Sequence, residues 1–358
     1  MPSQQIKVLF ITQKVDKDDN VLGSYHHWIK ELSFKVDSVS VICLFRGQVE
    51  LPVNANVYSL GKEIGTLKLG YAWNFYKYIW RLRKTYDVVL VHMNPVYVVL
   101  GSVLWHLWNK PTFMWYNHPQ GNFLAVAGIY LSKKVFCASS FSFAAKFSNA
   151  QIMPVGVDIG IFNKNPGGIK IKNSILYLGR ISPIKKIERL IKSAWILDSR
   201  GLDFTMLIVG NIASEADKAY LDKIRNLAGD LVSREKIKFQ PGIANKETPS
   251  IYNHNEIFVN LTPTGSFDKT IIEAMACETL VLVSNKVLES FFSENLKEAC
   301  LFEEGNIQQL ADKLSHLLSL SESLKEDYRR ELRAIVVKNH SLSILMERLV
   351  SQFITATV

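Results

Sequence analysis

Short apolar runs alternate with longer amphipathic segments along most of this 358-residue chain. Apolar runs of this length are typical of strands that are buried on both faces, as in a parallel sheet. The alternation therefore predicts parallel βαβ units. We expect strands at residues 7–12, 39–44, 56–59, 88–92, 112–116, 134–138 and 151–153 in the first half, and at 174–178, 205–209, 237–240, 257–260, 279–284 and 300–302 in the second.

The segment "NKNPGGIKIKNS", residues 163–174, interrupts this pattern and is rich in Gly, Pro and Lys. Such a composition predicts a linker, here residues 164–173. The fold class is then α/β, with two Rossmann-like doubly wound domains, 1–163 and 174–335, facing a central cleft. Ligands bind at the carboxyl ends of the strands in such folds. The glycine motifs of dinucleotide-binding and P-loop enzymes do not occur at the required places, which disfavours both classes.

Composition limits the environment of the protein. Four cysteines lie far apart without a C-x-x-C pair, which argues against a zinc site and for reduced cysteines in a cytoplasmic protein. The first twelve residues lack the apolar length of a signal peptide. The longest apolar stretch, residues 96–108, is shorter than the roughly 20 residues of a membrane span. We expect it to form a buried helix.

The net charge of +9 is unevenly placed. Residues 1–165 hold 17 Lys and Arg against 9 Asp and Glu, and the remainder holds 25 against 24. This asymmetry suggests an anionic partner for the first half: a nucleic acid, an acidic lipid surface or a phosphorylated substrate. Because the cations are dispersed and no nucleic-acid module is present, nucleic acid is the least favoured of the three.

Residues 67–86 form an aromatic and basic segment with helical periodicity. One stripe of this helix would consist of Leu69, Trp73, Tyr76 and Trp80. The helix either packs in the core against the first sheet or places its outer aromatics on an anionic membrane leaflet. In the second case the lipid headgroups would be met by Lys77, Arg81, Arg83 and Lys84.

Glu273 stands inside the apolar stretch "NLTPTGSFDKTIIEAMACETLVLVSN", residues 260–285. The residues around it predict a helix over 271–277 between two buried strands. Its carboxylate is then either exposed on that helix or held near a ligand, since helix N-termini at the carboxyl edge of a sheet bind ligands. Upstream, "YLGRISPIKKIERLIKSAWIL" places Arg180 and Lys185 in a loop after a strand. These two are either solvated charges or a cationic clamp for a diphosphate.

Together the two stretches resemble the carboxyl domain of retaining glycosyltransferase family 4 (glycosyl transferases group 1), which has the GT-B fold. The family pattern is Gly-Arg-x4-Lys followed by E-x7-E running into Glu-Ala-Met-Ala. The similarity extends to "MPVGVDIGIF", "YDVVLVHMN" and "FMWYNHPQG", and to "KNHSLSILMERLVSQF" near the end. It therefore covers nearly the whole chain, and it implies a closing helix over residues 336–358 that crosses back to the first domain.

The resemblance implies roles for particular residues. Arg180 and Lys185 match the pair that neutralises the donor diphosphate, and Glu273 matches the second Glu of E-x7-E, which holds the ribose hydroxyls. His118 resembles the histidine that reaches the transferred sugar from the first domain. Gly23 takes the place of a glycine-rich loop beside the diphosphate, although a Gly-Gly pair is usual there and this chain has Leu-Gly.

The chain departs from the family pattern at position 265, where Gly265 replaces the first Glu of E-x7-E. We expect the loop residues Gly265, Ser266, Phe267, Asp268 and Lys269 to contact the donor. Our hypothesis is that Asp268 replaces the missing carboxylate as an acceptor for a sugar hydroxyl. The alternative is that Asp268 caps the following helix, and both roles can hold at once.

The implied activity is sugar transfer from a nucleoside-diphosphate donor to a glycan or lipid-linked acceptor, with retention at the anomeric carbon and without metal or other cofactor. Asp16 and Asp18 form an Asp-x-Asp after the first strand, which we interpret as a solvated turn rather than a metal site. Two rival hypotheses remain: another GT-B enzyme, such as a sugar phosphorylase or nucleotide-sugar epimerase, and a non-catalytic nucleotide-sugar-binding protein.

Overall fold

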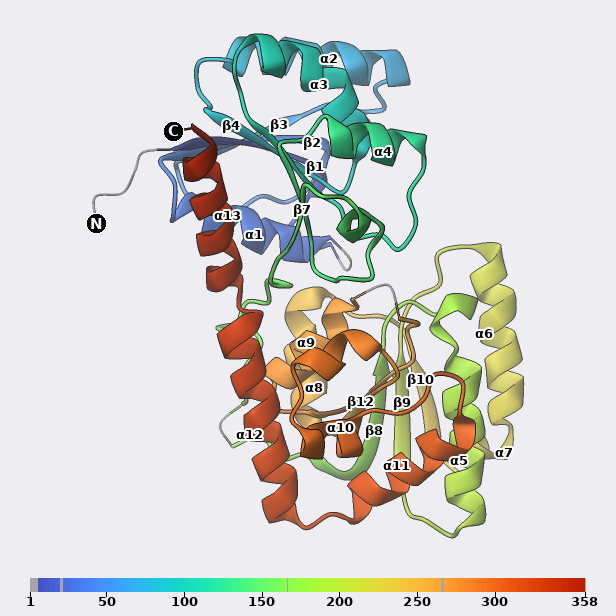
Figure 1. Cartoon of the computed structure of the whole chain (residues 1–358). Helices are drawn as coiled ribbons and strands as arrows, with labels where there is room; N and C mark the ends of the chain where they lie inside the picture. Colours follow the sequence, from blue (N-terminus) through green and yellow to red (C-terminus); the bar gives the residue numbers. More distant parts are fainter. Residues whose placement is uncertain (1–5, 20–21, 166, 265–266, 358) are drawn as a thin grey trace. The chain divides into compact units, whose positions relative to one another are not determined.

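The computed structural model describes residues 6–19, 22–165, 167–264 and 267–357. The chain divides into two compact units (Figure 1). The first consists of Met1–Asp158 together with Ser341–Val358, and the second is Ile159–His340. Both are α/β units built on parallel sheets, as the sequence predicts.

The first unit contains a seven-stranded sheet in the order β3-β2-β1-β4-β5-β6-β7, and all its paired strands run parallel. The order places the first strand in the middle, as in doubly wound folds. Strand β4 is buried throughout, which explains its uninterrupted apolar sequence. The strands are β1 (Lys7–Val15), β2 (Ser38–Arg46), β3 (Ala55–Ser59), β4 (Val88–His92), β5 (Thr112–Trp115), β6 (Lys134–Cys137) and β7 (Ala150–Ile152).

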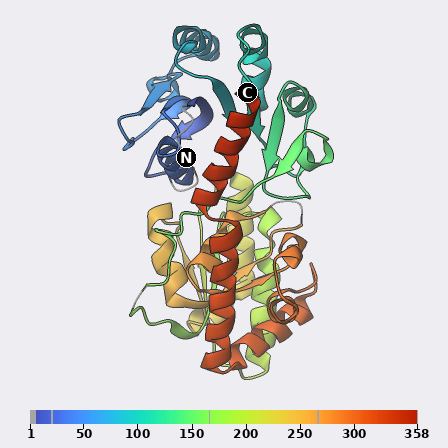
Figure 2. The same ribbon diagram turned by 60° about the vertical axis from the view of Figure 1, so that its left-hand side comes forward.

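Helices cover both faces of this sheet (Figure 1). Helices α2, α3 and α4 lie on one face, while α1 and α13 pack together on the other. Figure 2 brings α13 forward. The bounds are α1 (Gly23–Ser33), α2 (Lys68–Leu82), α3 (Pro95–Leu107), α4 (Phe123–Tyr130) and α13 (Leu342–Thr357), with 3-10 turns η1 (Lys62–Ile64) and η2 (Phe143–Lys146).

Helix α2 packs on the sheet through a different stripe from the one that its aromatics form. Phe75, Ile79 and Leu82 are buried against the core, whereas Leu69, Trp73, Tyr76 and Trp80 are exposed. The expectation that residues 96–108 form a buried helix is also only half right. Helix α3 buries Tyr97, Val98, Gly101 and Trp105, but its opposite face is apolar and open to solvent. A helix that packs on a sheet buries only one of its faces, so apolar residues on the opposite face remain exposed to solvent.

The second unit contains a five-stranded parallel sheet in the order β10-β9-β8-β11-β12. Its strands are β8 (Ile171–Leu178), β9 (Thr205–Val209), β10 (Ile237–Gln240), β11 (Asn255–Asn260) and β12 (Leu280–Val283). Its helices are α5 (Ile187–Ser199), α6 (Glu215–Ala228), α7 (Asp230–Ser233), α8 (Thr248–His254), α9 (Lys269–Ala276), α10 (Glu294–Cys300), α11 (Ile307–Ser319) and α12 (Glu322–Asn339), with turns η3 (Pro183–Lys185), η4 (Asn245–Glu247) and η5 (Lys286–Ser290).

Three expectations differ from the observed elements. Residues 300–302 form no strand: Cys300 ends α10, and Leu301 makes a single bridge to Val283. The expected linker, residues 164–173, lies inside the second unit, where Lys170 donates to the Asn255 carbonyl at 3.0 Å and β8 begins at Ile171. The closing helix expected over residues 336–358 is α13, which begins later, at Leu342, and belongs to the first unit, while residues 336–339 are the end of α12. No helix among the described residues is long and apolar enough to cross a membrane.

Phe353 of α13 should be essential for the stability of the first unit. Its ring is fully buried and lies 5.0 Å from the Phe113 ring of β5. Phe353→Ala should lower the free energy of unfolding by about 3–5 kcal/mol, the usual loss for a buried aromatic. Ser351→Ala, at an exposed position of the same helix, should change it by less than about 0.5 kcal/mol. Denaturant unfolding measures both, and equal effects would contradict the packing.

Candidate functional site

Arg180 and Lys185 lie in the loop between β8 and α5, at the carboxyl end of the sheet, as predicted. The Tyr177 hydroxyl, buried in β8, donates to the Arg180 carbonyl at 3.0 Å and fixes the start of this loop. The loop also depends on a close approach between Gly179, after β8, and Gly210, after β9. A Cβ added at Gly210 would lie 2.0 Å from the Gly179 carbonyl oxygen, so only glycine fits at position 210. Arg180 itself is exposed.

Lys185 connects this loop to the one that follows β11. Its Nζ lies 2.5 Å from Asp268 Oδ2 and donates to Thr262 Oγ1 at 3.0 Å. Strands β8 and β11 are neighbours in the sheet, so their carboxyl ends bring the two loops together. The ammonium is therefore held in a defined position at the strand ends.

Asp268 caps helix α9, because its Oδ1 accepts from the Thr270 backbone N–H at 3.3 Å. Its other contacts to protein donors are Lys185 Nζ at 2.5 Å, Asn260 Nδ2 at 3.1 Å, Thr262 Oγ1 at 3.0 Å and Thr270 Oγ1 at 2.9 Å. Burial would raise the pKa of Asp268, but the Lys185 ammonium and the hydrogen bonds from Asn260 and Thr270 hold that pKa well below its usual range. Asp268 is therefore an ionised carboxylate at neutral pH.

These contacts argue against our hypothesis that Asp268 binds a sugar hydroxyl. A carboxylate offers about four lone-pair sites, and five protein contacts already use them. We infer instead that Asp268 is a positioning residue, which caps α9 and holds Lys185 in place. The cap was one of the two roles expected for Asp268, whereas its ion pair with Lys185 was not expected.

Glu273 is buried in the second turn of α9, with 3% of its surface exposed. Burial raises the pKa of Glu273, against the opposing effects of Lys269 and the Asn245 side chain. The Tyr252 hydroxyl lies 3.4 Å from one carboxylate oxygen and Lys269 Nζ lies 3.9 Å from the other. Since the contacts to Tyr252 and Lys269 are long, the carboxylate keeps capacity to accept from donors in addition to the Asn245 side chain. The exposed alternative for Glu273 is excluded.

The remaining donor-loop residues have mixed environments. Phe267 is buried, with its ring 5.5 Å from the His340 ring, so its surroundings are those of a packing residue. Lys269 is the first residue of α9 and is partly exposed. Gly265 and Ser266 lie outside the described residues.

The two candidates in the first unit lie at the carboxyl ends of its strands. Gly23 is the first residue of α1, and its N–H donates to the Asp19 carbonyl at 3.1 Å. A Cβ there would lie 3.3 Å from the Lys17 carbonyl oxygen, so the backbone passes close by. His118 follows β5 and is exposed, with Nδ1 2.8 Å from the Gln120 carbonyl.

Asp16 belongs to a turn in which charges are paired. Lys14 Nζ lies 3.1 Å from Asp16 and 2.6 Å from Asp19, while Asp16 Oδ1 accepts from the Asp18 backbone N–H at 3.2 Å. Within the described ranges there is no group of three or more His, Cys, Asp or Glu side chains placed to hold a metal ion.

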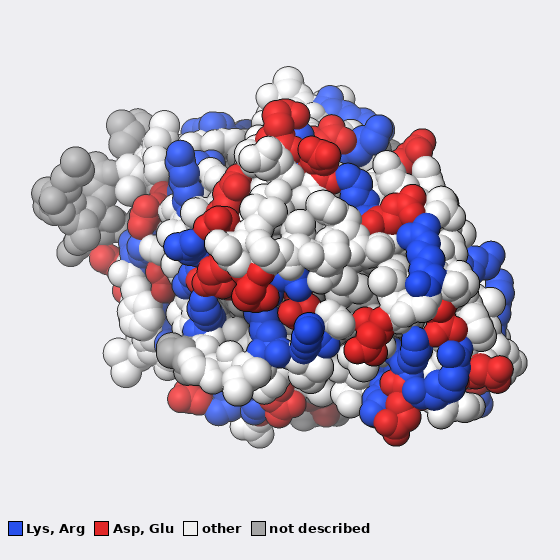
Figure 3. Space-filling view, turned by 90° about the horizontal axis from the view of Figure 1, so that it is seen from below, with Lys and Arg blue, Asp and Glu red and all other residues white. Residues whose placement is uncertain are grey.

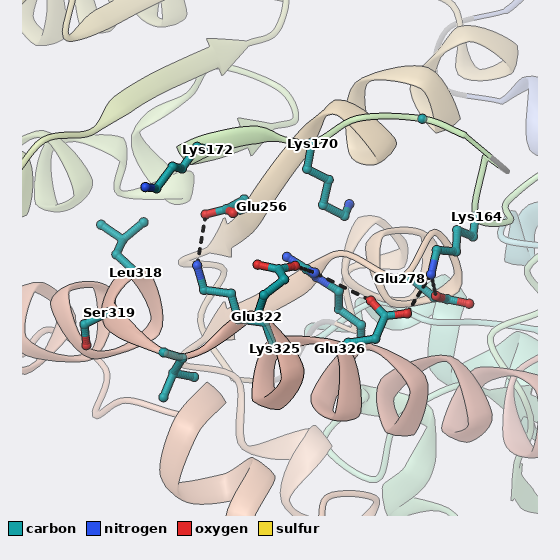
Figure 4. Close-up of a pocket in the computed structure, with 13 residues that line it drawn as sticks. Lys164, Lys170, Lys172, Glu256, Glu278, Leu318, Ser319, Glu322, Lys325 and Glu326 are labelled. Atoms are coloured by element: carbon teal, nitrogen blue, oxygen red, sulfur yellow. Dashed lines mark hydrogen bonds and ion pairs between the residues drawn. The ribbon is translucent and has the colours of Figure 1, made fainter.

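A cavity of about 640 Å³ lies in the second unit near the start of β8, far from the Arg180 loop at the other end of that strand (Figure 4). Its walls carry five Lys or Arg and four Glu residues, which largely pair with one another, as Lys325 does with Glu256 at 3.3 Å. The charged residues are Lys164, Lys170, Lys172, Lys325, Arg329, Glu256, Glu278, Glu322 and Glu326. The candidate site thus does not coincide with this cavity.

Sequence reasoning missed the residues that support the site. Asn260 and Thr262 bind Asp268, and Tyr252 lies beside Glu273. A signal existed only for Asn260, which is a buried polar residue at the last position of an apolar strand. Buried polar groups of this kind have specific partners.

Solved structures with the same fold cover nearly the whole chain. HepE of Anabaena, crystallised with UDP, aligns with a TM-score of 0.75 at 14% identity, over 98% of this chain and 100% of HepE. Sucrose-phosphate synthase of Thermosynechococcus elongatus aligns with a TM-score of 0.73 at 15% identity, over 98% and 100%. The fold is GT-B, with two Rossmann-like units.

A family model matches most of the second unit. Residues 162–334 match the family model of glycosyl transferases group 1. The capsular polysaccharide biosynthesis glycosyltransferase CapM of Staphylococcus aureus is 28% identical over 182 residues, 50% of this chain and 45% of CapM. D-inositol 3-phosphate glycosyltransferase of Paenarthrobacter aurescens is 24% identical over 153 residues, 40% and 36%. The matches thus span less than half the length of these relatives.

Asp268→Asn and Glu273→Gln should affect stability differently at pH 7. Ionised Asp268 stabilises the fold above its unfolded pKa of about 4, and this contribution is lost as the pH falls toward the lower folded value. Asp268→Asn should therefore cost about 3 kcal/mol at pH 7, the loss for a broken buried pair, and less in acid. Glu273 has a raised folded pKa, so its ionisation destabilises the fold as the pH rises. Glu273→Gln should leave the stability at pH 7 unchanged or raise it.

Denaturant unfolding between pH 3 and pH 7 measures both changes. Glu304→Gln, at an exposed position of the same unit, serves as the control and should change stability by less than about 0.5 kcal/mol. Equal losses in Asp268→Asn and Glu273→Gln at pH 7 would contradict the opposite environments assigned to the two carboxylates.

Proposed function

We propose that this protein is a retaining glycosyltransferase that moves a hexose from a nucleoside-diphosphate donor to a glycan or lipid-linked acceptor without a metal ion. The observation that carries the proposal is the site in the second unit, where exposed Arg180, fixed Lys185 and buried Glu273 border the carboxyl end of one sheet. It lies within the residues that match the family model of glycosyl transferases group 1.

The chemistry follows from the charges. When the sugar–phosphate bond breaks, negative charge develops on the leaving diphosphate. A guanidinium binds two phosphate oxygens at once, and Lys185 supplies a point charge whose position is already set. Cations placed before the reaction stabilise this charge without reorganisation. The two cations would thus do the work that a divalent metal does in other transferases.

Glu273 would bind the nucleoside of the donor. A buried carboxylate with long protein contacts is suited to accept hydrogen bonds from two ribose hydroxyls, which would replace the hydration it lost on folding. The crystallised complexes of HepE with UDP and with UDP-glucose favour uracil as the first base to test. His118 and Gly23 remain proposed contacts to the sugar and the diphosphate.

The acceptor and the location are proposed more broadly. The name of CapM, a capsular polysaccharide biosynthesis enzyme, favours a glycan or lipid-linked glycan as acceptor. The first unit would hold this acceptor, and it carries most of the net positive charge of the chain. All four cysteines are buried free thiols, which supports a cytoplasmic location, at or near an anionic membrane surface.

The test is binding and turnover of nucleotide sugars by the purified protein. A thermal-shift series with UDP-, GDP-, ADP- and dTDP-sugars should show stabilisation by one base, following RT ln(1 + [L]/Kd). The protein with that donor and a membrane-extracted acceptor should transfer the sugar in EDTA, and the product should keep the donor's anomeric configuration. Turnover that needs free phosphate indicates a phosphorylase, and turnover without acceptor to an isomeric sugar indicates an epimerase. Tight binding without any turnover indicates a binding protein.

Arg180→Ala should lower kcat/KM by roughly 30- to 1000-fold, the loss expected for one charge donor at developing negative charge, about 2–4 kcal/mol. Its exposed position predicts an unchanged unfolding free energy. Lys185→Ala should lower kcat/KM similarly but also destabilise the protein, because it leaves Asp268 unpaired. The control is Lys192→Ala, an exposed cation on α5, which should leave both quantities unchanged. Near-normal kinetics in Arg180→Ala would remove it from the diphosphate site.

A further inference from the structure

Helices α2 and α3 of the first unit lie side by side and present one apolar surface to solvent. The Tyr76 hydroxyl donates to the Leu100 carbonyl at 3.0 Å, and the rings of Trp80 and Trp108 are 5.6 Å apart. We name the exposed residues of this face the aromatic surface. Its members are Leu69, Trp73, Tyr76 and Trp80 of α2, with Val103 and Leu107 of α3.

The exposure of these side chains is large. Leu69 is 87% exposed and Trp73 is 73%, while Val103 and Leu107 are 67% and 69%. Single exposed apolar residues are common, but a contiguous apolar group spanning two helices marks a site of interaction. The inner faces of both helices already bury the core residues Phe75, Ile79 and Trp105. The outer apolar residues are therefore not required to hold the helices on the sheet.

The charges around the aromatic surface are predominantly positive. Between Gly65 and Val157 the sequence has nine Lys or Arg and one acidic residue, Asp87. Lys68, Lys77, Arg81 and Lys84 are exposed on or next to α2, and the Arg83 guanidinium lies 4.8 Å from the Trp80 ring centroid. By contrast, the face of the second unit seen in Figure 3 mixes Lys and Arg with Asp and Glu.

We propose that the aromatic surface docks on an anionic lipid bilayer. Trp and Tyr side chains favour the boundary between headgroups and acyl chains, where an apolar ring and a polar edge are both accommodated. Leu69, Val103 and Leu107 enter the acyl boundary beside them, and the flanking cations meet the phosphate or carboxylate headgroups. A second copy of this chain would bring like charges together around the same residues, so a bilayer is the better partner. The inference deepens the proposed function, because it places the enzyme where a lipid-linked acceptor resides.

Vesicle sedimentation without donor or acceptor tests the docking. The wild-type protein should bind vesicles of phosphatidylcholine with one third phosphatidylglycerol, and bind pure phosphatidylcholine far less. Lys77→Gln/Arg81→Gln/Lys84→Gln should weaken binding about a hundredfold, since each cation near the surface contributes about fivefold. Leu69→Gln/Trp73→Gln should weaken it tenfold or more, and binding should fall with ionic strength.

Matched controls separate this surface from general charge or stickiness. Lys218→Gln/Lys223→Gln/Arg225→Gln removes three exposed cations from α6 of the second unit. Phe34→Gln removes an exposed ring at the end of α1, on the other face of the first sheet (Figure 1). Both variants should bind vesicles like the wild type, and circular dichroism should show every variant folded.

The outcomes also separate this proposal from the proposed function. Binding that is absent in the wild type, or unchanged in both surface variants, overturns the docking, whatever the enzymatic activity. A wild-type dimer in light scattering that Leu69→Gln/Trp73→Gln converts to a monomer assigns the surface to a second copy instead. Specific vesicle binding without any sugar transfer leaves the docking in place and overturns the function.

Discussion

The ion pair between Lys185 and Asp268 is the contact on which the candidate site depends. It joins the loop after β8 to the start of α9, with Nζ and Oδ2 2.5 Å apart. The same carboxylate caps α9 and accepts from Asn260 at the end of β11. One partly buried carboxylate thus sets the position of a cation and the start of the helix that carries Glu273. Because the pair is largely shielded from water, its geometry is more constrained than that of a surface ion pair.

The pKa values of the two carboxylates in this region are shifted in opposite directions. Asp268 has a lowered pKa because Lys185 and several hydrogen-bond donors outweigh its burial, whereas burial dominates at Glu273 and raises its pKa. If stability were the only requirement, both carboxylates would be paired with cations, or neither would be buried. The paired Asp268 carboxylate fixes the positions of protein groups. The buried Glu273 carboxylate keeps lone pairs that can accept hydrogen bonds from a ligand. Carboxylates whose pKa values are shifted by an identifiable physical cause are often found at functional sites.

The sequence predicted the two-unit α/β architecture well, because strands buried on both faces need continuous apolar runs, as in β4 and β12. It predicted Arg180, Lys185 and Glu273 at strand ends and helix starts from local patterns. It could not predict the partner of Lys185, which lies 83 residues away in the chain, nor that Asp268 is already saturated by protein donors. The strand expected at 300–302 is reduced to a single bridge between Leu301 and Val283, because α10 continues to Cys300 and leaves little chain to pair.

Helix α2 shows the same limit, since periodicity alone does not say which apolar stripe faces the core. Phe75 and Ile79 pack against the sheet, and the stripe of Leu69, Trp73, Tyr76 and Trp80 remains exposed to solvent. Folding therefore accounts for the buried stripe of α2 but not for the apolar residues of its exposed stripe. An exposed apolar stripe lowers the solubility of the protein. The scarcity of acidic residues around it is equally unnecessary for the fold, because the second unit reaches a similar architecture with nearly balanced charges. Two independent features that folding does not require, exposed apolar residues and predominantly positive charge, coincide on one surface. A lipid bilayer, which is apolar inside and anionic at its boundary, accounts for both.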